Sequence, residues 1–351
     1  MTAMMPAYRI AAWEQSPALV EAPVPHPAAG QVTVRVAGNG LCHSDFLMAQ
    51  MPGSIGEAIG WRVPFTLGHE IAGWIAEVGD GVRGWSSGDP VAVVSPSSCG
   101  HCEYCMRGQE IACDHGTAGR GYGRDGGLAP FVLVDDTRAL LRLEHLDPRA
   151  AGPLTDAGAP SCHAVKRVLP KLTGDDAVAV VIGAGGLGAY AIQLLRAMST
   201  ARVIAVDTNP ARLDIARELG ADDALAGVDT STVPQLLELT AGRGPNAVLD
   251  FVGIDATIDA SLAAVRKLGA YALVGASGGK LNRPWFGATK EADVICFQGS
   301  NISDARDVLA LAEDGRLRSE IDEFPLDRVG DAYDALEQGT LRGRAVVIPT
   351  T

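Results

Sequence analysis

The first 150 residues consist of short apolar runs separated by turn signals. Hydrophobic and polar positions alternate over residues 31–36, 71–78 and 90–94, and clusters of glycine, serine, aspartate and proline lie between these runs. Short alternating strands bounded by such turns are typical of an antiparallel β domain. The pattern therefore predicts an all-β first domain, with a barrel as the expected form.

From about residue 155 the hydrophobic period changes. Apolar runs that predict buried strands now alternate with stretches of helical period; the strands are expected at 178–182, 202–207, 247–251 and 271–274, and the helices at 187–198, 210–219 and 256–268. This alternation is typical of a parallel α/β sheet. A helix at 303–314 and a strand at 345–348 are expected to return to the first domain. The chain is thus predicted to form two domains, residues 1–155 with 299–351 and residues 156–298.

Residues 177–195 carry no charge, so a transmembrane helix is the competing interpretation. Glycines in the middle of this stretch and β-branched residues before them favour a buried strand, a tight turn and a helix. The first 11 residues contain one arginine and no apolar run, and we expect no signal peptide and a cytoplasmic protein.

The balance of acidic and basic residues limits the classes of binding partner that we expect. The 351 residues carry a formal net charge of −13, with 47% hydrophobic residues. This composition is typical of a globular protein, and an acidic chain does not attract nucleic acid or anionic lipid. We expect a small-molecule partner, with no nucleic-acid or membrane partner.

Four of the seven cysteines lie close together, at Cys99, Cys102, Cys105 and Cys113. Four thiolates with C-x2-C spacing are typical of a closed, structural zinc site. An iron–sulfur cluster, which uses the same ligands, is the alternative. His101 lies inside this loop and is interpreted as an exposed loop residue.

A glycine-rich stretch follows the first strand of the second domain. It has the pattern G-x-G-x-x-G, with a predicted strand before it and a helix after it, at Gly183, Gly185, Gly186, Leu187 and Gly188. In this context Gly183 permits a tight turn, Gly185 allows the backbone to approach a pyrophosphate, and Gly188 allows helix and strand to pack closely. Asp207 ends the next strand and is expected to bind both ribose hydroxyls, which favours NAD over NADP. The alternative is a glycine-rich turn without a ligand. A second such stretch, residues 121–127, is interpreted as a hairpin.

A second set of metal-binding residue types lies in the β domain. Cys42-His43-Ser44-Asp45 and Gly68-His69-Glu70 both follow short β segments. A thiolate, an imidazole and one more ligand make an open zinc site with room for water or substrate.

Together these motifs resemble the zinc-dependent medium-chain alcohol dehydrogenases over essentially the full chain, and among them the bacterial secondary-alcohol dehydrogenases or carbonyl reductases. The resemblance implies a GroES-like β-barrel domain, with the structural zinc loop at 99–113, joined to a Rossmann NAD-binding domain. It implies two zinc ions per chain and Cys42 and His69 as ligands of the catalytic one. Asp156 is the expected third ligand, with Glu70 as a nearby carboxylate that can reach the metal. In the polyol-dehydrogenase branch Glu70 would be the ligand instead.

The resemblance also implies further roles. Ser44 would take the hydroxyl proton of the alcohol as hydride passes to the nicotinamide, and Asp45 would orient His69. The expected cofactor contacts outside the glycine turn are His43, Asp207, Arg212, Val252, Gly275 and Arg344. Leu47 stands where some members have a relay histidine. Cys162 and His163 are interpreted as ordinary helix residues.

The expected reaction is the reversible oxidation of an alcohol, secondary or of medium size and apolar, to a ketone or aldehyde. Pocket walls are expected from Ser44, Leu47, the stretch around Trp61, Trp285 and Phe297. The family implies a homo-oligomer, dimer or tetramer. The competing functions are a polyol dehydrogenase, a quinone oxidoreductase without metal, and a non-catalytic zinc-binding structural or regulatory protein.

Overall fold

A computed structural model describes residues 3–229, 231–282 and 289–349, and the chain divides into two compact units. The first unit contains Met1–Asp156 and Asn301–Thr351, and the second contains Ala157–Ser300. The chain therefore passes between the units twice, after Asp156 and after Ser300.

The first unit is built on antiparallel sheets. The larger has the strand order β10 (Leu140–Arg142), β6 (Pro90–Val93), β5 (Glu70–Val78), β3 (Val32–Gly40), β18 (Arg344–Ile348), β17 (Ile321–Pro325), and β9 (Phe131–Val134) also pairs with β3. Only the β17–β18 pair within it is parallel. A second sheet has the order β2 (Ala18–Pro23), β1 (Met4–Ile10), β4 (Phe65–Thr66). The alternating pattern seen in the sequence thus forms strands with one face in the core.

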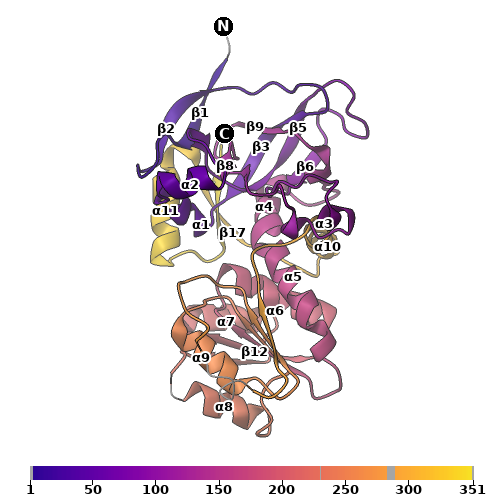
Figure 1. Cartoon of the computed structure of the whole chain (residues 1–351), viewed down its shortest axis with the longest axis vertical. Coiled ribbons are helices and arrows are strands. Elements are labelled where there is room, and N and C mark those ends of the chain that lie inside the picture. The colour runs from indigo at the N-terminus through magenta and orange to yellow at the C-terminus, as the bar shows by residue number, and fades with distance from the viewer. Residues whose placement is uncertain (1–2, 230, 283–288, 350–351) are drawn as a thin grey trace. The chain divides into compact units, whose positions relative to one another are not determined.

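Short helices lie at the strand ends of this unit. They are α1 (Ser44–Ala49), α2 (Gly53–Ala58), α3 (Glu103–Met106), η1 (Glu110–Ala112), η2 (Thr137–Ala139), α4 (Pro148–Pro153), α10 (Ile302–Glu313), η6 (Leu326–Arg328) and α11 (Val329–Gln338). Residues 329–349, yellow in Figure 1, return to the first unit, where β18 pairs with β3. Side chains of α11, Tyr333 among them, join the apolar cluster that contains Leu41 and Phe65.

The second unit is a parallel sheet with helices. Its strand order is β13 (Asp223–Ala226), β12 (Arg202–Asp207), β11 (Val178–Ile182), β14 (Ala247–Asp250), β15 (Ala270–Leu273), β16 (Asp293–Cys296). The helical segments are α5 (Ala159–Val168), η4 (Leu169–Lys171), α6 (Gly186–Met198), α7 (Pro210–Glu218), α8 (Thr232–Leu239) and α9 (Asp255–Ala264). When the strands are numbered in chain order, their order across the sheet is 3-2-1-4-5-6, which is the Rossmann arrangement. Ligands bind such sheets at the point where the order reverses, which lies here between β11 and β14.

The uncharged stretch 177–195 forms strand β11, a turn and the start of α6, as expected. Among the described residues, none of the helices is both long and apolar enough to cross a lipid bilayer.

The predicted hairpin at residues 121–127 is wrong. Two short strands, β7 (Gly119–Arg120) and β8 (Gly123–Arg124), pair in parallel instead. Gly121 and Gly123 have φ of +85° and +79°, which glycine adopts readily, and these two turns bring β8 beside β7 in the same direction.

Candidate active site and nucleotide-binding turn

Three predicted metal ligands come together in the first unit. One ligand atom each of Cys42, His69 and Asp156 lies within 4.8 Å of the other two. The Nε2 atom of His69 is 3.5 Å from Oδ2 of Asp156. Zinc bonds of about 2.0–2.2 Å in a tetrahedron place nitrogen and oxygen ligands about 3.3–3.6 Å apart. The three side chains therefore fit a zinc ion, with the fourth position left for substrate or water.

Local backbone features place these three ligands. Cys42 lies between β3, which ends at Gly40, and α1, which begins at Ser44. His69 follows Gly68, whose φ of +93° turns the chain before β5 begins, and the Ser95 hydroxyl donates to the His69 carbonyl. Asp156 lies in the π-helical segment η3 (Leu154–Gly158) between α4 and α5. Such π-helical turns occur often at functional sites, and this one carries the third predicted ligand.

Neighbouring polar groups fix the His69 ring. Its Nδ1 atom lies 3.2 Å from Oδ1 of Asp45, and its Nε2 atom lies 3.3 Å from the Ser44 hydroxyl. Asp45 is 1% exposed and accepts hydrogen bonds from the Tyr333 hydroxyl (3.0 Å) and the Cys42 backbone N–H (3.2 Å). Contact with Asp45 at Nδ1 leaves Nε2 for a metal. The expected pairing of Asp45 with His69 is confirmed, whereas Tyr333, 288 residues away in sequence, carried no signal that could have identified it.

Two opposing effects act on these ionisable groups. Burial disfavours the charged imidazolium, but the carboxylates of Asp156 and Asp45 outweigh it and hold the pKa of His69 well above its ordinary value. Burial likewise disfavours the Asp156 carboxylate, but His69 holds the pKa of Asp156 below its ordinary value. In the absence of metal, the imidazole and carboxylate thus compensate each other.

Glu70 lies beside this set but faces another partner. Its side chain is fully buried and forms an ion pair with the Arg344 guanidinium, which also donates to the Leu41 carbonyl (2.8 Å). Burial raises the pKa of Glu70 to about 8, with Arg344 opposing this shift and Asp156 adding to it. Arg344, predicted to contact the cofactor, is 6% exposed in this arrangement.

An aromatic wall stands next to His69. The ring of Tyr122 packs edge-on against His69 at 5.8 Å and tilts against Trp61 at 5.9 Å. Burial raises the pKa of Tyr122. Leu47, also predicted to line the pocket, is 64% exposed. Sequence analysis named Trp61 but missed Tyr122, since a tyrosine in a glycine-rich loop has no pattern of its own.

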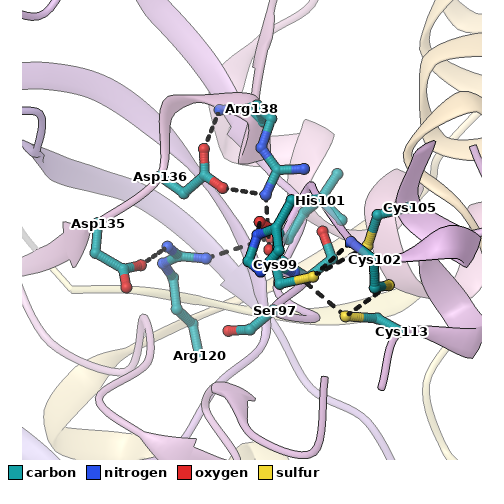
Figure 2. Close-up of polar contacts among 12 residues, drawn as sticks. Ser97, Cys99, His101, Cys102, Cys105, Cys113, Arg120, Asp135, Asp136 and Arg138 are labelled. Atoms are coloured by element: carbon teal, nitrogen blue, oxygen red, sulfur yellow. Dashed lines mark hydrogen bonds and ion pairs between the residues drawn. The ribbon is translucent and has the colours of Figure 1, made fainter. Parts of the chain in front are cut away.

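The four-cysteine loop forms a compact thiol cluster (Figure 2). The Sγ atoms of Cys99 and Cys105 are 3.9 Å apart, and those of Cys102 and Cys113 are 4.0 Å apart. A tetrahedral ion with Zn–S bonds of about 2.3 Å requires about 3.8 Å, so the cluster fits zinc. Backbone N–H groups of Cys99 and His115 donate to Cys113 Sγ. Hydrogen bonds from the backbone lower the pKa of Cys102 to about 6, while burial raises that of Cys105 to about 12.

The glycine-rich turn of the second unit has the geometry that its sequence predicts. Gly183 has a φ of +86°, and its N–H donates to the Val206 carbonyl (2.8 Å). A Cβ on Gly188 would lie 1.8 Å from the Gly183 carbonyl oxygen. A Cβ on Gly185 would meet nothing closer than 3.5 Å, from the Arg212 guanidinium. This turn leads into α6, whose first N–H groups can bind a diphosphate.

Asp207 sits at the end of β12, beside this turn. Its two carboxylate oxygens accept hydrogen bonds from the backbone N–H groups of Ala184 and Asn209, both at 2.8 Å. The Arg212 guanidinium is 4.0 Å away. Asp207 thus lies where a carboxylate could accept hydrogen bonds from the ribose hydroxyls of a nucleotide bound at the glycine turn.

Buried Asp250 holds the turn after β14, the strand on the other side of β11. It accepts hydrogen bonds from the backbone N–H groups of Val252 (2.9 Å) and Gly253 (3.0 Å), and from the Tyr271 hydroxyl (3.1 Å). A Cβ on Gly275 would lie 2.3 Å from the Val252 carbonyl carbon, so these two predicted cofactor residues are tightly packed. Asp250 was not predicted from the sequence.

The remaining predicted residues are distributed over both units. His43 is exposed at the start of α1. Cys162 and His163 lie in α5, and His163 packs edge-on against Phe297 at 5.6 Å. Trp285 lies outside the described residues.

Family models match both units. Residues 28–145 match the alcohol dehydrogenase GroES-like domain, and residues 186–314 match the zinc-binding dehydrogenase domain. An NAD-dependent alcohol dehydrogenase of Sulfurisphaera tokodaii is 35% identical over 340 residues, which cover 94% of this chain and 96% of that protein. The chain belongs to the zinc-type medium-chain alcohol dehydrogenase family.

Two other members of this family bear on the assignment. The crystal structure of the alcohol dehydrogenase from Aeropyrum pernix is similar, with a TM-score of 0.89, 34% identity, and coverage of 98% of this chain and 100% of that one. A D-arabinose 1-dehydrogenase (NADP(+)) of Saccharolobus solfataricus is 31% identical, over 93% of this chain and 92% of that protein. The family thus includes members named for different cofactors and substrates.

The contact between Gly188 and Gly183 makes a testable prediction about this family member. Gly188→Ala forces a Cβ against a backbone oxygen, and we expect a loss of about 1–3 kcal/mol of unfolding free energy. The control, Gly185→Ala, adds a Cβ at ordinary van der Waals distance from Arg212 and replaces only an N-cap glycine, so it should cost about 1 kcal/mol or less. Thermal and urea unfolding measure both; equal stability of the two variants would contradict this packing role for Gly188.

Proposed function

We propose that this protein is a zinc-dependent alcohol dehydrogenase that transfers hydride reversibly between an alcohol and NAD, giving a ketone or aldehyde. The observation that carries the proposal is the set of Cys42, His69 and Asp156, with ligand atoms within 4.8 Å of one another. A protein that used zinc only for its structure would not need this second, open set beside the four-cysteine loop. The relatives named NAD-dependent alcohol dehydrogenase support the same function.

We propose that Cys42, His69 and Asp156 hold the catalytic zinc and that Cys99, Cys102, Cys105 and Cys113 hold a structural one. When bound at the open site, zinc supplies a Lewis acid for the substrate oxygen, and NAD supplies the hydride acceptor. The thiolate and carboxylate bring two negative charges, and the neutral imidazole is oriented by Asp45 at 3.2 Å. Glu70, paired with Arg344, is available as a nearby carboxylate.

Ser44 is the proposed first proton acceptor. Its hydroxyl lies 3.3 Å from His69 Nε2, so it faces the metal position and can accept a hydrogen bond from an alcohol bound there. Leu47 offers no acceptor. We therefore propose that Ser44 passes the proton on towards solvent, and bound NAD would supply ribose hydroxyls and ordered water as the neighbouring hydrogen-bonding groups.

NAD is proposed to bind the second unit. Its diphosphate would lie on Gly183, Gly185, Gly186, Leu187 and Gly188 and its ribose on Asp207, with Arg212, Val252 and Gly275 nearby. In the first unit, His43 and Arg344 are the proposed contacts. In this assignment residues 156–298 form the NAD-binding domain, and residues 1–155 with 299–351 form the catalytic domain.

The proposed substrate is a secondary or medium-sized apolar alcohol. Trp61 and Tyr122 present an aromatic wall beside His69, which favours apolar groups over several hydroxyls. A sugar or polyol is the related alternative, given the D-arabinose dehydrogenase among the relatives. We further propose a homo-oligomer, dimer or tetramer, in the cytoplasm, where the seven cysteines stay reduced.

The first test of this function joins activity to metal content. We expect two zinc ions per chain and NADH formation from simple secondary alcohols, more than from polyols. Cys42→Ala should remove activity and one zinc while the fold remains. Cys102→Ala should instead lower stability first, because structural zinc contributes folding free energy directly. Fully active protein with one zinc per chain, or inactive protein with two, would overturn the proposal.

A second prediction separates the two carboxylates. Asp156→Asn keeps the shape but removes a charge from the ligand set, so zinc affinity and kcat/KM should both fall steeply. Glu70→Gln leaves that set intact, and we expect the milder loss of about 10–100-fold that is typical of residues around metal ligands. Metal analysis and steady-state kinetics measure both variants. The opposite order would make Glu70 the ligand, as in the polyol-dehydrogenase branch.

A third prediction concerns the cofactor. The 2′-phosphate of NADP carries about −1.5 to −2 charges. At about 4 Å from the Asp207 carboxylate, two unit charges repel by about 4 kcal/mol at an effective dielectric constant of 20. After partial relief by solvent we expect a net preference for NAD of about 2–4 kcal/mol, or about 30–1,000-fold in kcat/KM.

Asp207→Gly should narrow this ratio. Because Asp207 also holds the Ala184 N–H, activity with both cofactors can fall, and the ratio of the two kcat/KM values is the readout. The companion variant Arg212→Ala removes the guanidinium that lies 4.0 Å from Asp207 and tests whether this group supports NADP use. Equal or better use of NADP by the unaltered enzyme would show that Asp207 does not read the ribose.

A further inference from the structure

The outer side of the four-cysteine loop carries a second group of metal-ligating side chains. One ligand atom each of Cys99, His101 and His115 lies within 4.8 Å of the other two. The rings of His101 and His115 stack at 6.1 Å, and both side chains are exposed. These two histidines have no part in the proposed dehydrogenase mechanism.

A hydrogen bond sets the tautomer of His101. Its Nδ1 atom is 2.8 Å from the Cys99 carbonyl oxygen (Figure 2). A carbonyl only accepts, so Nδ1 carries the proton and Nε2 keeps its lone pair. Histidines that bind metals in proteins commonly donate their other N–H to a backbone carbonyl in this way. Nε2 of His101 is therefore the ring nitrogen whose lone pair can bind a metal.

Charge also favours a second cation at this position. Four thiolates around one divalent ion leave a net charge of −2, and a coordinated thiolate keeps lone pairs that can bridge to another soft ion. An opposing charge nearby is the Arg138 guanidinium beside Gly100, which donates to the Ser98 carbonyl (2.6 Å) and pairs with Asp136. Because Asp136 compensates Arg138, this cation opposes a second metal only weakly.

We propose that Cys99, His101 and His115 form a second zinc site on the outer side of the four-cysteine loop. It shares the Cys99 thiolate with the structural zinc, and water completes its coordination. Its affinity is lower than that of the four-cysteine site, because two of its ligands are neutral imidazoles on exposed side chains. Imidazole and thiolate ligands select zinc or another soft divalent ion over magnesium or calcium.

The test titrates zinc into protein that already holds its two tightly bound ions per chain. We expect calorimetry to detect a third equivalent. The double variant His101→Ala/His115→Ala should weaken it by at least about 100-fold, the upper range for lost metal-supporting groups. His145→Ala, which removes another exposed histidine, should leave it unchanged. Absence of a third equivalent, or equal affinity in the double variant, would overturn the proposal.

A cobalt titration identifies the shared ligand. Co²⁺ added to the zinc-loaded protein should produce a thiolate charge-transfer band if it binds Cys99, and the double variant should lack this band. Cobalt binding without the band would show that Cys99 is not a ligand and would overturn the shared site. Both readouts concern the third equivalent alone, so their failure leaves the two-zinc dehydrogenase proposal untouched.

Discussion

Buried carboxylates are the constraint on which the first unit depends. Asp45 and Glu70 are 1% and 0% exposed, and a buried charge without compensation costs several kcal/mol. Each therefore needs a partner in a fixed place. Tyr333 and His69 serve Asp45, and Arg344 serves Glu70. Tyr333 and Arg344 come from the C-terminal segment of the chain. Asp45 and Glu70 therefore lack these partners until that segment has packed onto the first unit.

The same principle organises the second unit. Asp207 and Asp250 are the last residues of β12 and β14, the two strands that flank β11, and both are buried. Their charges are compensated by backbone N–H groups in the loops after β11, β12 and β14, at Ala184, Asn209, Val252 and Gly253. Carboxylates thus hold in place the loops at the strand ends, where a Rossmann sheet binds its nucleotide.

The elements best predicted from the sequence were those with a clear hydrophobic period. Strands β11 and β12 begin and end where the pattern predicts, and the helix predicted at 187–198 starts one residue earlier. Strand β13 was missed, because residues 223–226 are only partly buried or exposed and carry no alternation. Helix α8, which follows it, was also missed. The hairpin prediction at 121–127 was wrong, because a glycine-rich stretch specifies only weakly how its short strands pair.

Candidate site residues that belong to a sequence motif could be predicted from the sequence. Residues that act only through tertiary contacts could not. The four cysteines, Cys42, His69 and the glycine turn have local spacing that reports their chemistry. The partners Tyr333 and Asp250 act only through tertiary contacts, and Tyr122 differs from any other tyrosine only by its position against His69. For Arg344 the sequence could suggest a cofactor contact, but the ion pair with Glu70 depends on how β18 packs against β3.

The central claim is that Cys42, His69 and Asp156 together hold the catalytic metal. Diffraction from crystals of zinc-loaded protein on both sides of the zinc absorption edge tests it directly. The account predicts an anomalous peak about 2.0–2.3 Å from Cys42 Sγ, His69 Nε2 and an Asp156 carboxylate oxygen, with Glu70 still on Arg344. A peak bound to Glu70, with Asp156 turned away, or no peak beside Cys42 in active protein, would contradict it.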